Sequence, residues 1–161
     1  KAWVPEDVHG ALVGWWDAEG RHRARSFEGH GSSSVEDFII YGPTAFSTLP
    51  TDLKDRVRRA MRPILERFCA CKLQDAALVH GLRAYHDGAT LIPHLDWADR
   101  WVVSATISVC HRRGNASTER GWPFVVQASS LLPGGARASE LAIREGEALL
   151  YEGSRLYHGR P

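Results

Sequence analysis

The second half of this sequence predicts many short strands and no helix of any length, and this pattern restricts the folds open to the chain. From residue 76 onward, runs rich in β-branched and aromatic residues alternate with turn signals. The predicted strands cover residues 77–85, 89–96, 101–110, 122–127, two short stretches on either side of Glu145-Gly146, and 155–159. Asp87-Gly88 separates the first two strands and is a strong hairpin signal, so we expect these strands to pair.

A helix precedes these strands. Thr51 is the expected N-cap, and apolar residues then recur at helical spacing, which predicts an amphipathic helix that packs on a sheet. Its apolar stripe is Leu53, Val57, Ala60 or Met61, Ile64, Leu65 and Phe68. Pro63 falls inside the stripe and should kink the helix or split it in two. Before the helix we expect a loop over residues 21–34 and a strand over residues 35–42.

One or two helices followed by many short strands predict a mainly β chain of the α+β class. We expect its strands to form a small antiparallel barrel or a double-sheet jelly roll, also called a double-stranded β-helix. The length of 161 residues is that of a single domain. Residues 1–75 are expected to be a support that contains the helix, and residues 76–161 to be the jelly-roll core.

The strand predicted over residues 101–110 has two faces of different character. Its alternation places Val102, Ser104, Thr106 and Ser108 on one face and Trp101, Val103, Ala105, Ile107 and Val109 on the other. Such a strand suits a barrel wall whose more polar face lines a hydrated interior.

Three residues in the predicted strands form a candidate metal site. His94 and Asp96 are two positions apart in one strand, so their side chains share a face. The best candidate for a third ligand is His158, which lies 62 residues beyond Asp96 (158 minus 96), far enough for the chain to cross the roll and return. Two histidines and one carboxylate on one side of an ion are the facial ligand set of non-haem Fe(II) oxygenases.

With these residues in place, the sequence resembles the 2-oxoglutarate- and Fe(II)-dependent oxygenases, particularly their prolyl-4-hydroxylase-like branch. The His-x-Asp pair alone is a weak signal, but its combination with the flanking pieces is much more specific. In chain order, the matching pieces are Arg83-Ala84-Tyr85-x-x-Gly88, His94-Leu95-Asp96, Arg100 with the SATISV strand, Trp122-Pro123, the REGEALLYEG segment and Leu156-Tyr157-His158-Gly159-Arg160. They span roughly residues 78–161, about half of the chain.

The resemblance implies a function and a set of site residues. It makes His94, Asp96 and His158 the iron ligands and the catalytic centre, with Tyr85 facing the 2-oxoglutarate pocket and Thr106 on a strand that lines it. Three protein ligands leave three coordination positions, two for the keto acid and one for O2. The implied reaction hydroxylates a protein side chain, such as a prolyl group, or a small molecule, with release of succinate and CO2.

One departure from the family concerns the anchor for the far carboxylate of 2-oxoglutarate. Relatives place a Lys or Arg about ten residues beyond the distal histidine, on a closing strand, whereas this sequence continues for three residues beyond His158. We expect the closing strand to be missing from residues 76–161. Arg160 and Arg83 are the alternative anchors, because a guanidinium suits bidentate pairing with a carboxylate.

Two other functions are compatible with the same residues. The chain could be a catalytically silent jelly roll that keeps the metal for a binding or assembly role. It could also be a cupin-type Zn or Mn enzyme, although the His-x-Asp spacing disfavours this because cupins more often carry His-x-His. Trp97 and Trp101 flank the candidate site, either as a substrate wall or as ordinary packing.

Composition narrows the choice of partners. The 20 basic and 19 acidic residues give a formal net charge of +1, which implies no electrostatic field for nucleic acid. No apolar run approaches the roughly 20 residues that a membrane span needs. We therefore expect a soluble chain, cytoplasmic rather than secretory, that binds a protein, peptide or small-molecule substrate; the sequence does not indicate an oligomeric state.

The cysteines do not suggest a disulfide framework. Cys69 and Cys71 fall in the predicted helix, where residues two apart do not face each other. We expect them, and Cys110, to be free thiols.

Overall fold

The structure is a computed structural model, and it describes residues 1–28, 39–75, 77–111, 122–128 and 137–161. Its helical elements are α1 (Glu6–Trp15), a π-helical turn η1 (Trp16–Gly20), α2 (Arg21–Arg23) and α3 (Thr51–Cys69). Its strands are β1 (Ala2–Trp3), β2 (Arg25–Glu28), β3 (Ile40–Tyr41), β4 (Pro43–Ser47), β5 (Leu82–Tyr85), β6 (Thr90–His94), β7 (Ser104–Ile107), β8 (Trp122–Ala128), β9 (Ala138–Ile143), β10 (Glu147–Tyr151) and β11 (Leu156–Arg160).

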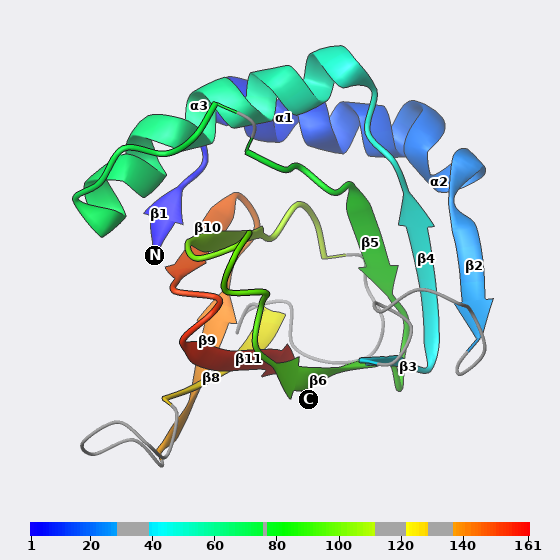
Figure 1. The fold of residues 1–161 in the computed structure, drawn as a ribbon. Coiled ribbons are helices and arrows are strands. Elements are labelled where there is room, and N and C mark those ends of the chain that lie inside the picture. The colour runs from blue at the N-terminus through cyan, green and yellow to red at the C-terminus, as the bar shows by residue number, and fades with distance from the viewer. Residues whose placement is uncertain (29–38, 76, 112–121, 129–136) are drawn as a thin grey trace.

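The described strands form three antiparallel sheets. Their strand orders are β1-β10-β7, β3-β6-β11-β8-β9 and β2-β4-β5. In Figure 1, α1 and α3 lie side by side along one side of the strands, and no helix follows α3 in the part of the chain that the structure describes. The predicted α+β class is therefore confirmed, whereas the closure of these strands into a jelly roll remains a prediction.

Helix α3 packs through its apolar stripe. Leu53, Val57 and Met61 are buried, and they pack with Val8 and Leu12 of α1. Because these residues recur every four positions, they line one face of the helix and leave the opposite face to charged residues. Within the described residues, no helix is long and apolar enough to cross a membrane.

Of the kink or split predicted at Pro63, the split does not occur. Helix α3 is continuous from Thr51 to Cys69, and Pro50 rather than Thr51 occupies the N-cap position. Pro63 cannot donate the hydrogen bond that would join it to the carbonyl of Arg59, four residues earlier. Both residues lie on the exposed side of the helix, where water can hydrogen-bond that carbonyl instead.

Strand β10 separates two core clusters. Ala148 and Leu150 pack in the cluster formed with the helices, whereas Leu149 and Tyr151 pack in a second cluster with β8 and β9. Successive strand residues point to opposite faces, so an apolar run of this kind is buried on both sides. The sheet that contains β10 therefore lies between a layer of helices and the five-stranded sheet.

Strand β7 has the two faces that its sequence predicts, over a shorter range. Ala105 and Ile107 pack against the helix cluster, whereas the hydroxyls of Ser104 and Thr106 point to the other side. The strand covers residues 104–107 of the predicted 101–110. Similarly, β5 covers only the last four residues of the predicted strand 77–85.

The predicted hairpin at Asp87-Gly88 is wrong, although the turn itself is present. The N–H of Ala89 donates to the carbonyl of His86 at 3.0 Å, and Gly88 has a φ of 82°. However, β5 pairs with β4, and β6 pairs with β3 and β11. The residues Asp87-Gly88 determine that the chain turns here. Which strands then pair depends on which side chains are buried together in the folded protein.

The region before α3 also differs from its prediction. The loop expected over residues 21–34 contains α2 and β2, and its last six residues lie outside the described residues. Of the strand expected over 35–42, the structure describes β3 at its end, while residues 35–38 lie outside the described part. The next strand, β4, was not predicted; Pro43 is tolerated there because it is the first residue of the strand.

The prediction that Cys69 and Cys71 are free thiols is wrong. They form a disulfide, with their Cα atoms 5.1 Å apart, whereas Cys110 is free. The prediction placed both residues inside the helix, but α3 ends at Cys69. Ala70 then adopts the left-handed conformation, with a φ of 50°, which turns the chain so that Cys71 lies back against Cys69.

Candidate metal centre

Strands β6 and β11 bring the two predicted histidines together. The strands pair antiparallel, and His158 lies directly opposite His94 in the register. The register shifts between His158 and Arg160, next to Pro93, which has no N–H to donate to the ladder. Gly159 makes the close approach possible here, because a Cβ at this position would lie 2.5 Å from the carbonyl oxygen of Leu91.

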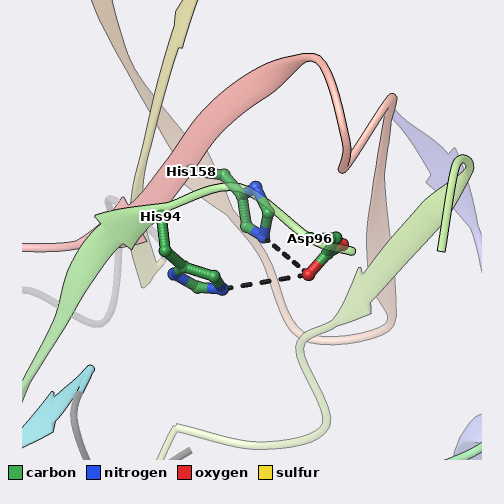
Figure 2. Close-up of side chains that lie close together, drawn as sticks. All are labelled: His94, Asp96 and His158. Carbon is green, nitrogen blue, oxygen red and sulfur yellow. Dashed lines mark ion pairs between the residues drawn. The ribbon is translucent and has the colours of Figure 1, made fainter. Parts of the chain in front are cut away.

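Asp96 completes the group. Strand β6 ends at His94, earlier than predicted, yet the carboxylate two residues later still reaches the histidines. The distances from Asp96 Oδ1 are 3.6 Å to His158 Nε2 and 3.9 Å to His94 Nε2. Figure 2 shows both imidazoles directed at this one oxygen atom, and one donor atom of each residue lies within 4.8 Å of the others. Donors bound to one ion at about 2.1 Å and at right angles lie ~3 Å apart, so a small movement of these side chains would allow a shared divalent ion.

Hydrogen bonds on the far side of each ring orient the histidines as ligands. His94 Nδ1 lies 2.9 Å from the carbonyl oxygen of Ile92, and His158 Nδ1 lies 2.9 Å from that of Leu156. Because a carbonyl can only accept, each Nδ1 is the donor and carries the hydrogen. Each Nε2 therefore presents a lone pair to the site, as metal-binding histidines do when a carbonyl fixes their tautomer.

Ser104 and Gly153 hold Asp96 from the other side. The Ser104 hydroxyl donates to Asp96 Oδ2 at 2.6 Å, which leaves Oδ1 facing the histidines. The backbone N–H of Asp96 donates to the carbonyl of Gly153 at 2.9 Å. Gly153 must lack a side chain, because a Cβ there would lie 2.0 Å from Asp96 Oδ2 and 2.6 Å from Ser104 Oγ.

The protonation states favour metal binding. Burial raises the pKa of Asp96, but its contacts with His158 and the hydrogen bond from Ser104 outweigh burial, so this pKa lies below its usual value of 3.8. Burial lowers the pKa of His94 below its usual value of 6.5. At neutral pH the carboxylate is therefore ionised and the His94 imidazole is neutral, which are the forms that bind a metal.

Aromatic rings enclose His158, which is only 2% exposed. Tyr151 lies against its ring with centroids 4.5 Å apart, and Phe124 stacks on it at 6.1 Å. The Tyr151 hydroxyl hydrogen-bonds Thr106 at 3.0 Å, and burial raises the pKa of this tyrosine, so the hydroxyl stays protonated. One side of the candidate site is therefore closed to water.

The three residues of the triad line a large cleft. The four residues that the resemblance assigns to the keto acid, Tyr85, Thr106, Arg160 and Arg83, all line this cleft. The Arg160 guanidinium lies 5.0 Å from the centre of the Tyr85 ring and donates to the carbonyl of Ala89 at 2.9 Å. The roles of these four residues toward a keto acid remain predictions.

Arg83 occupies a different part of the cleft wall. Its guanidinium lies 5.0 Å from the centre of the Phe46 ring and donates to the hydroxyl of Thr44 at 3.3 Å. Phe46 and Thr44 belong to β4, so Arg83, on β5, contacts the neighbouring strand of its own three-stranded sheet. Arg160 instead lies on β11, the strand that carries His158.

Aromatic side chains line the cleft beyond Asp96. The rings of Trp97 and Trp101 have centroids 6.2 Å apart, and His80 packs edge-on to Trp101 at 5.6 Å. Arg100 lies over Trp97 at 5.3 Å. Trp97 is 47% exposed, which favours an accessible wall over ordinary core packing for this residue.

The sequence identifies the three candidate ligands, but it assigns no role to Ser104, Gly153 or Tyr151. For Ser104 the sequence does contain an indication of a role at the site, since the alternation of residues 101–110 places its hydroxyl on the more polar face. Gly153 and Tyr151 lie in the REGEALLYEG segment that contributes to the resemblance, but that segment assigns neither residue a role. Their contacts with Asp96 and His158 cross between separate strands and depend on how the sheets pack.

The fold and the site define an α+β protein with a candidate metal centre of two histidines and one aspartate. Comparisons with protein families, with curated proteins and with solved structures returned no match for this chain.

Proposed function

We propose that this chain is a non-haem Fe(II)- and 2-oxoglutarate-dependent dioxygenase that hydroxylates a protein side chain or a small molecule. The observation that supports this most is the convergence of His94, Asp96 and His158 beside a large cleft. A structural metal site usually surrounds its ion with four protein ligands, whereas a three-ligand site keeps positions open for reactants.

The donor set fits Fe(II), since two imidazoles and one carboxylate form the facial ligand group of the non-haem Fe(II) oxygenases. When bound, Fe(II) together with 2-oxoglutarate and O2 would supply the oxidising power for hydroxylation, with succinate and CO2 as the other products. The protein orients the metal ligands and excludes water from one side of the site. Ser104 fixes the carboxylate, backbone carbonyls fix both imidazoles, and the rings of Tyr151 and Phe124 exclude water behind His158.

For the far carboxylate of 2-oxoglutarate we favour Arg160 over Arg83 within the described chain. Arg160 lies two residues beyond His158 on β11 and lines the cleft with Tyr85. Burial lowers the pKa of Arg160, but arginine remains a cation in proteins, and a half-buried cation pairs more strongly with a carboxylate than an exposed one. The substrate would then approach over the exposed aromatic wall at Trp97.

The decisive assay measures succinate release. Protein prepared without oxygen would be supplied with Fe(II), 2-oxoglutarate, O2 and a panel of peptides and small molecules. We expect turnover that His94→Ala and Asp96→Asn each abolish. The control is His22→Ala, which removes an exposed histidine in α2 that does not line the cleft. Absence of Fe(II)-dependent succinate from the wild-type protein across the panel would contradict the proposal.

Calorimetry separates this proposal from the catalytically silent module and from the cupin-type Zn or Mn enzyme. A dioxygenase loaded with Mn(II) should bind 2-oxoglutarate and its unreactive analogue N-oxalylglycine, and Arg160→Ala should weaken both. A silent module should bind the metal but neither keto acid. Metal analysis of protein isolated without oxygen would identify a Zn or Mn enzyme directly.

A further inference from the structure

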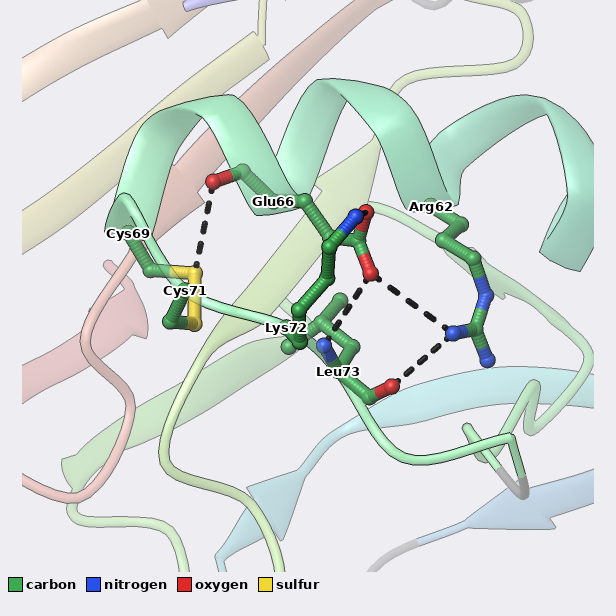
Figure 3. The surroundings of a disulfide bond; sticks show 6 residues. All are labelled: Arg62, Glu66, Cys69, Cys71, Lys72 and Leu73. Carbon is green, nitrogen blue, oxygen red and sulfur yellow. Dashed lines mark hydrogen bonds and ion pairs between the residues drawn. A yellow bond between two sulfur atoms is a disulfide. The ribbon is translucent and has the colours of Figure 1, made fainter.

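The Cys69–Cys71 disulfide lies at the surface, where α3 ends. Cys71 is exposed and Cys69 is partly exposed, so a small thiol in solution can reach the bond. Figure 3 shows the bridge at the end of the helix and the chain after Cys71 folding back along α3. Neither cysteine belongs to the candidate metal centre.

This bridge can contribute little to folding stability. It joins residues only two positions apart. In the chain-entropy account, the stabilisation by a disulfide grows with the length of the loop that it closes, and this loop is close to the shortest possible. Helix α3 is instead anchored by its buried residues Leu53, Val57 and Met61.

The segment after Cys71 is held against α3 by contacts that do not need the bridge. Glu66 Oε1 accepts a hydrogen bond from the N–H of Leu73 at 3.1 Å, and Lys72 Nζ lies 3.3 Å from Glu66 Oε2. Arg62 donates to the carbonyls of Leu73 and Gln74 at 2.8 and 2.7 Å. The hydrogen bond from Leu73 is also the main reason why the pKa of Glu66 lies below its usual value. Reduction would therefore leave the two thiols close together.

A hydrogen-bond acceptor lies within reach of the Cys69 thiol in the reduced form. Its Sγ atom lies 3.7 Å from the carbonyl oxygen of Glu66. In the disulfide this sulfur has no hydrogen to donate, so the contact becomes a hydrogen bond only when Cys69 is a thiol.

We propose that Cys69 and Cys71 form a reversible thiol–disulfide exchange site that accepts two electrons from small thiols of the glutathione class. A thiolate attacks the Sγ of Cys71, the more exposed of the two residues, breaks the Cys69–Cys71 bond and releases the Cys69 thiolate, which takes a proton from water. A second thiolate attacks the outer sulfur of the mixed disulfide, releases Cys71 as a thiolate that is protonated in turn, and forms the oxidised small-molecule disulfide. The cysteine pair is reduced and two thiols are oxidised.

The test is a redox titration of the folded protein. A Cys110→Ser variant, which leaves only this pair, would be equilibrated at pH 7 in graded ratios of reduced to oxidised glutathione, quenched with acid, alkylated and weighed by mass spectrometry. We expect both cysteines to change together and reversibly between the unmodified and the doubly alkylated mass. If Cys71 is the attacked residue, Cys69→Ser in the same background should accumulate one stable glutathione adduct.

Two results would overturn the proposal. One is a disulfide that persists in the native protein at every ratio of reduced to oxidised glutathione but is reduced in urea. This is the behaviour of a structural disulfide that thiols cannot reach in the folded protein. The other is a pair that stays as two thiols, or carries two glutathiones, in excess oxidised glutathione.

Arg62→Gln tests the part played by the contacts of the following segment. We expect it to lower the equilibrium constant for bridge formation about fivefold, the worth of roughly one net hydrogen bond. Arg67→Gln is the matched control, because among the described residues Arg67 makes no hydrogen bond or ion pair and is exposed on the same helix. An equal shift in both variants would show that the Arg62 contacts do not hold the thiols together. Circular dichroism would verify that each variant is folded.

Discussion

His158 and His94 lie directly opposite each other on β11 and β6, with their ring centroids 4.4 Å apart. The separation of these two candidate ligands is thus determined by the spacing of two hydrogen-bonded strands, which varies little. Asp96 lies beyond the end of β6, so its position depends instead on its contacts with Ser104 and Gly153. Contacts to Asp96 should therefore control metal affinity more than changes elsewhere in the sheet.

Ser104→Ala tests this control. The substitution removes the hydrogen bond that holds Asp96 Oδ2, so we expect the affinity for Mn(II), measured by calorimetry, to fall about tenfold, as for other partners of metal-bound carboxylates. Ser108→Ala is the control, because it removes a similar hydrogen bond, to His111 at 2.8 Å, without touching the triad. Equal affinities in the two variants would argue against a positioning role for Ser104.

Gly153→Ala should damage the site through sterics. The new Cβ would lie 2.0 Å from Asp96 Oδ2, so the carboxylate must move and Mn(II) affinity should fall by more than about tenfold. Gly10→Ala is a contrasting glycine substitution, within α1 and with no atom within 4 Å of the new Cβ. It should stabilise the fold by about 0.5–1 kcal/mol in urea denaturation and leave metal binding unchanged. Wild-type metal affinity in Gly153→Ala would show that Asp96 is not a ligand in this position.

Tyr151→Phe separates packing from chemistry. The ring against His158 is retained, while the partly buried hydroxyl of Thr106 loses its partner. We expect a loss of about 1 kcal/mol in the free energy of unfolding, measured in urea, and unchanged Mn(II) affinity. A strong loss of metal affinity would instead mean that the Tyr151 hydroxyl acts directly on the site.

Metal binding should weaken on acidification. The pKa values of His94 and Asp96 lie below their ordinary values of 6.5 and 3.8, so both groups are in their metal-binding forms at neutral pH. As the pH falls below 6.5 and through the lowered pKa of His94, protons compete for its Nε2 and the affinity should drop. Calorimetric titrations with Mn(II) between about pH 5 and 8 would check this, and affinity that rises toward acid would contradict it.

The same shifts predict how the stability of the metal-free protein varies with pH. A histidine or carboxyl group with a lowered pKa in the folded state binds protons less readily than in the unfolded chain. The contribution of His94 is complete above 6.5 and is lost as the pH falls through its lowered pKa; that of Asp96 behaves likewise below 3.8. Urea denaturation at a series of pH values should therefore show stability decreasing toward acid, and less so in His94→Gln.

Several features were predictable because they depend on local spacing. The stripe of α3 follows from apolar residues that recur every four positions, and the two faces of β7 from alternation. The failed predictions concern pairing and chain ends. Asp87-Gly88 makes its turn, but β5 and β6 enter different sheets. Cys69 and Cys71 can bond because α3 ends at Cys69 and Ala70 turns the chain, which their spacing alone does not show.

The sequence by itself determined the α+β class, the apolar and the more polar face of β7, and the identity of the three candidate ligands, because residue type and periodicity are local properties. Only the tertiary structure decided that β11 pairs with β6, that Ser104 and Gly153 hold Asp96, and that Arg160 and Tyr85 line the same cleft. The physical reason is that contacts between distant segments depend on which apolar faces are buried together, and many pairings of short strands satisfy the same local pattern.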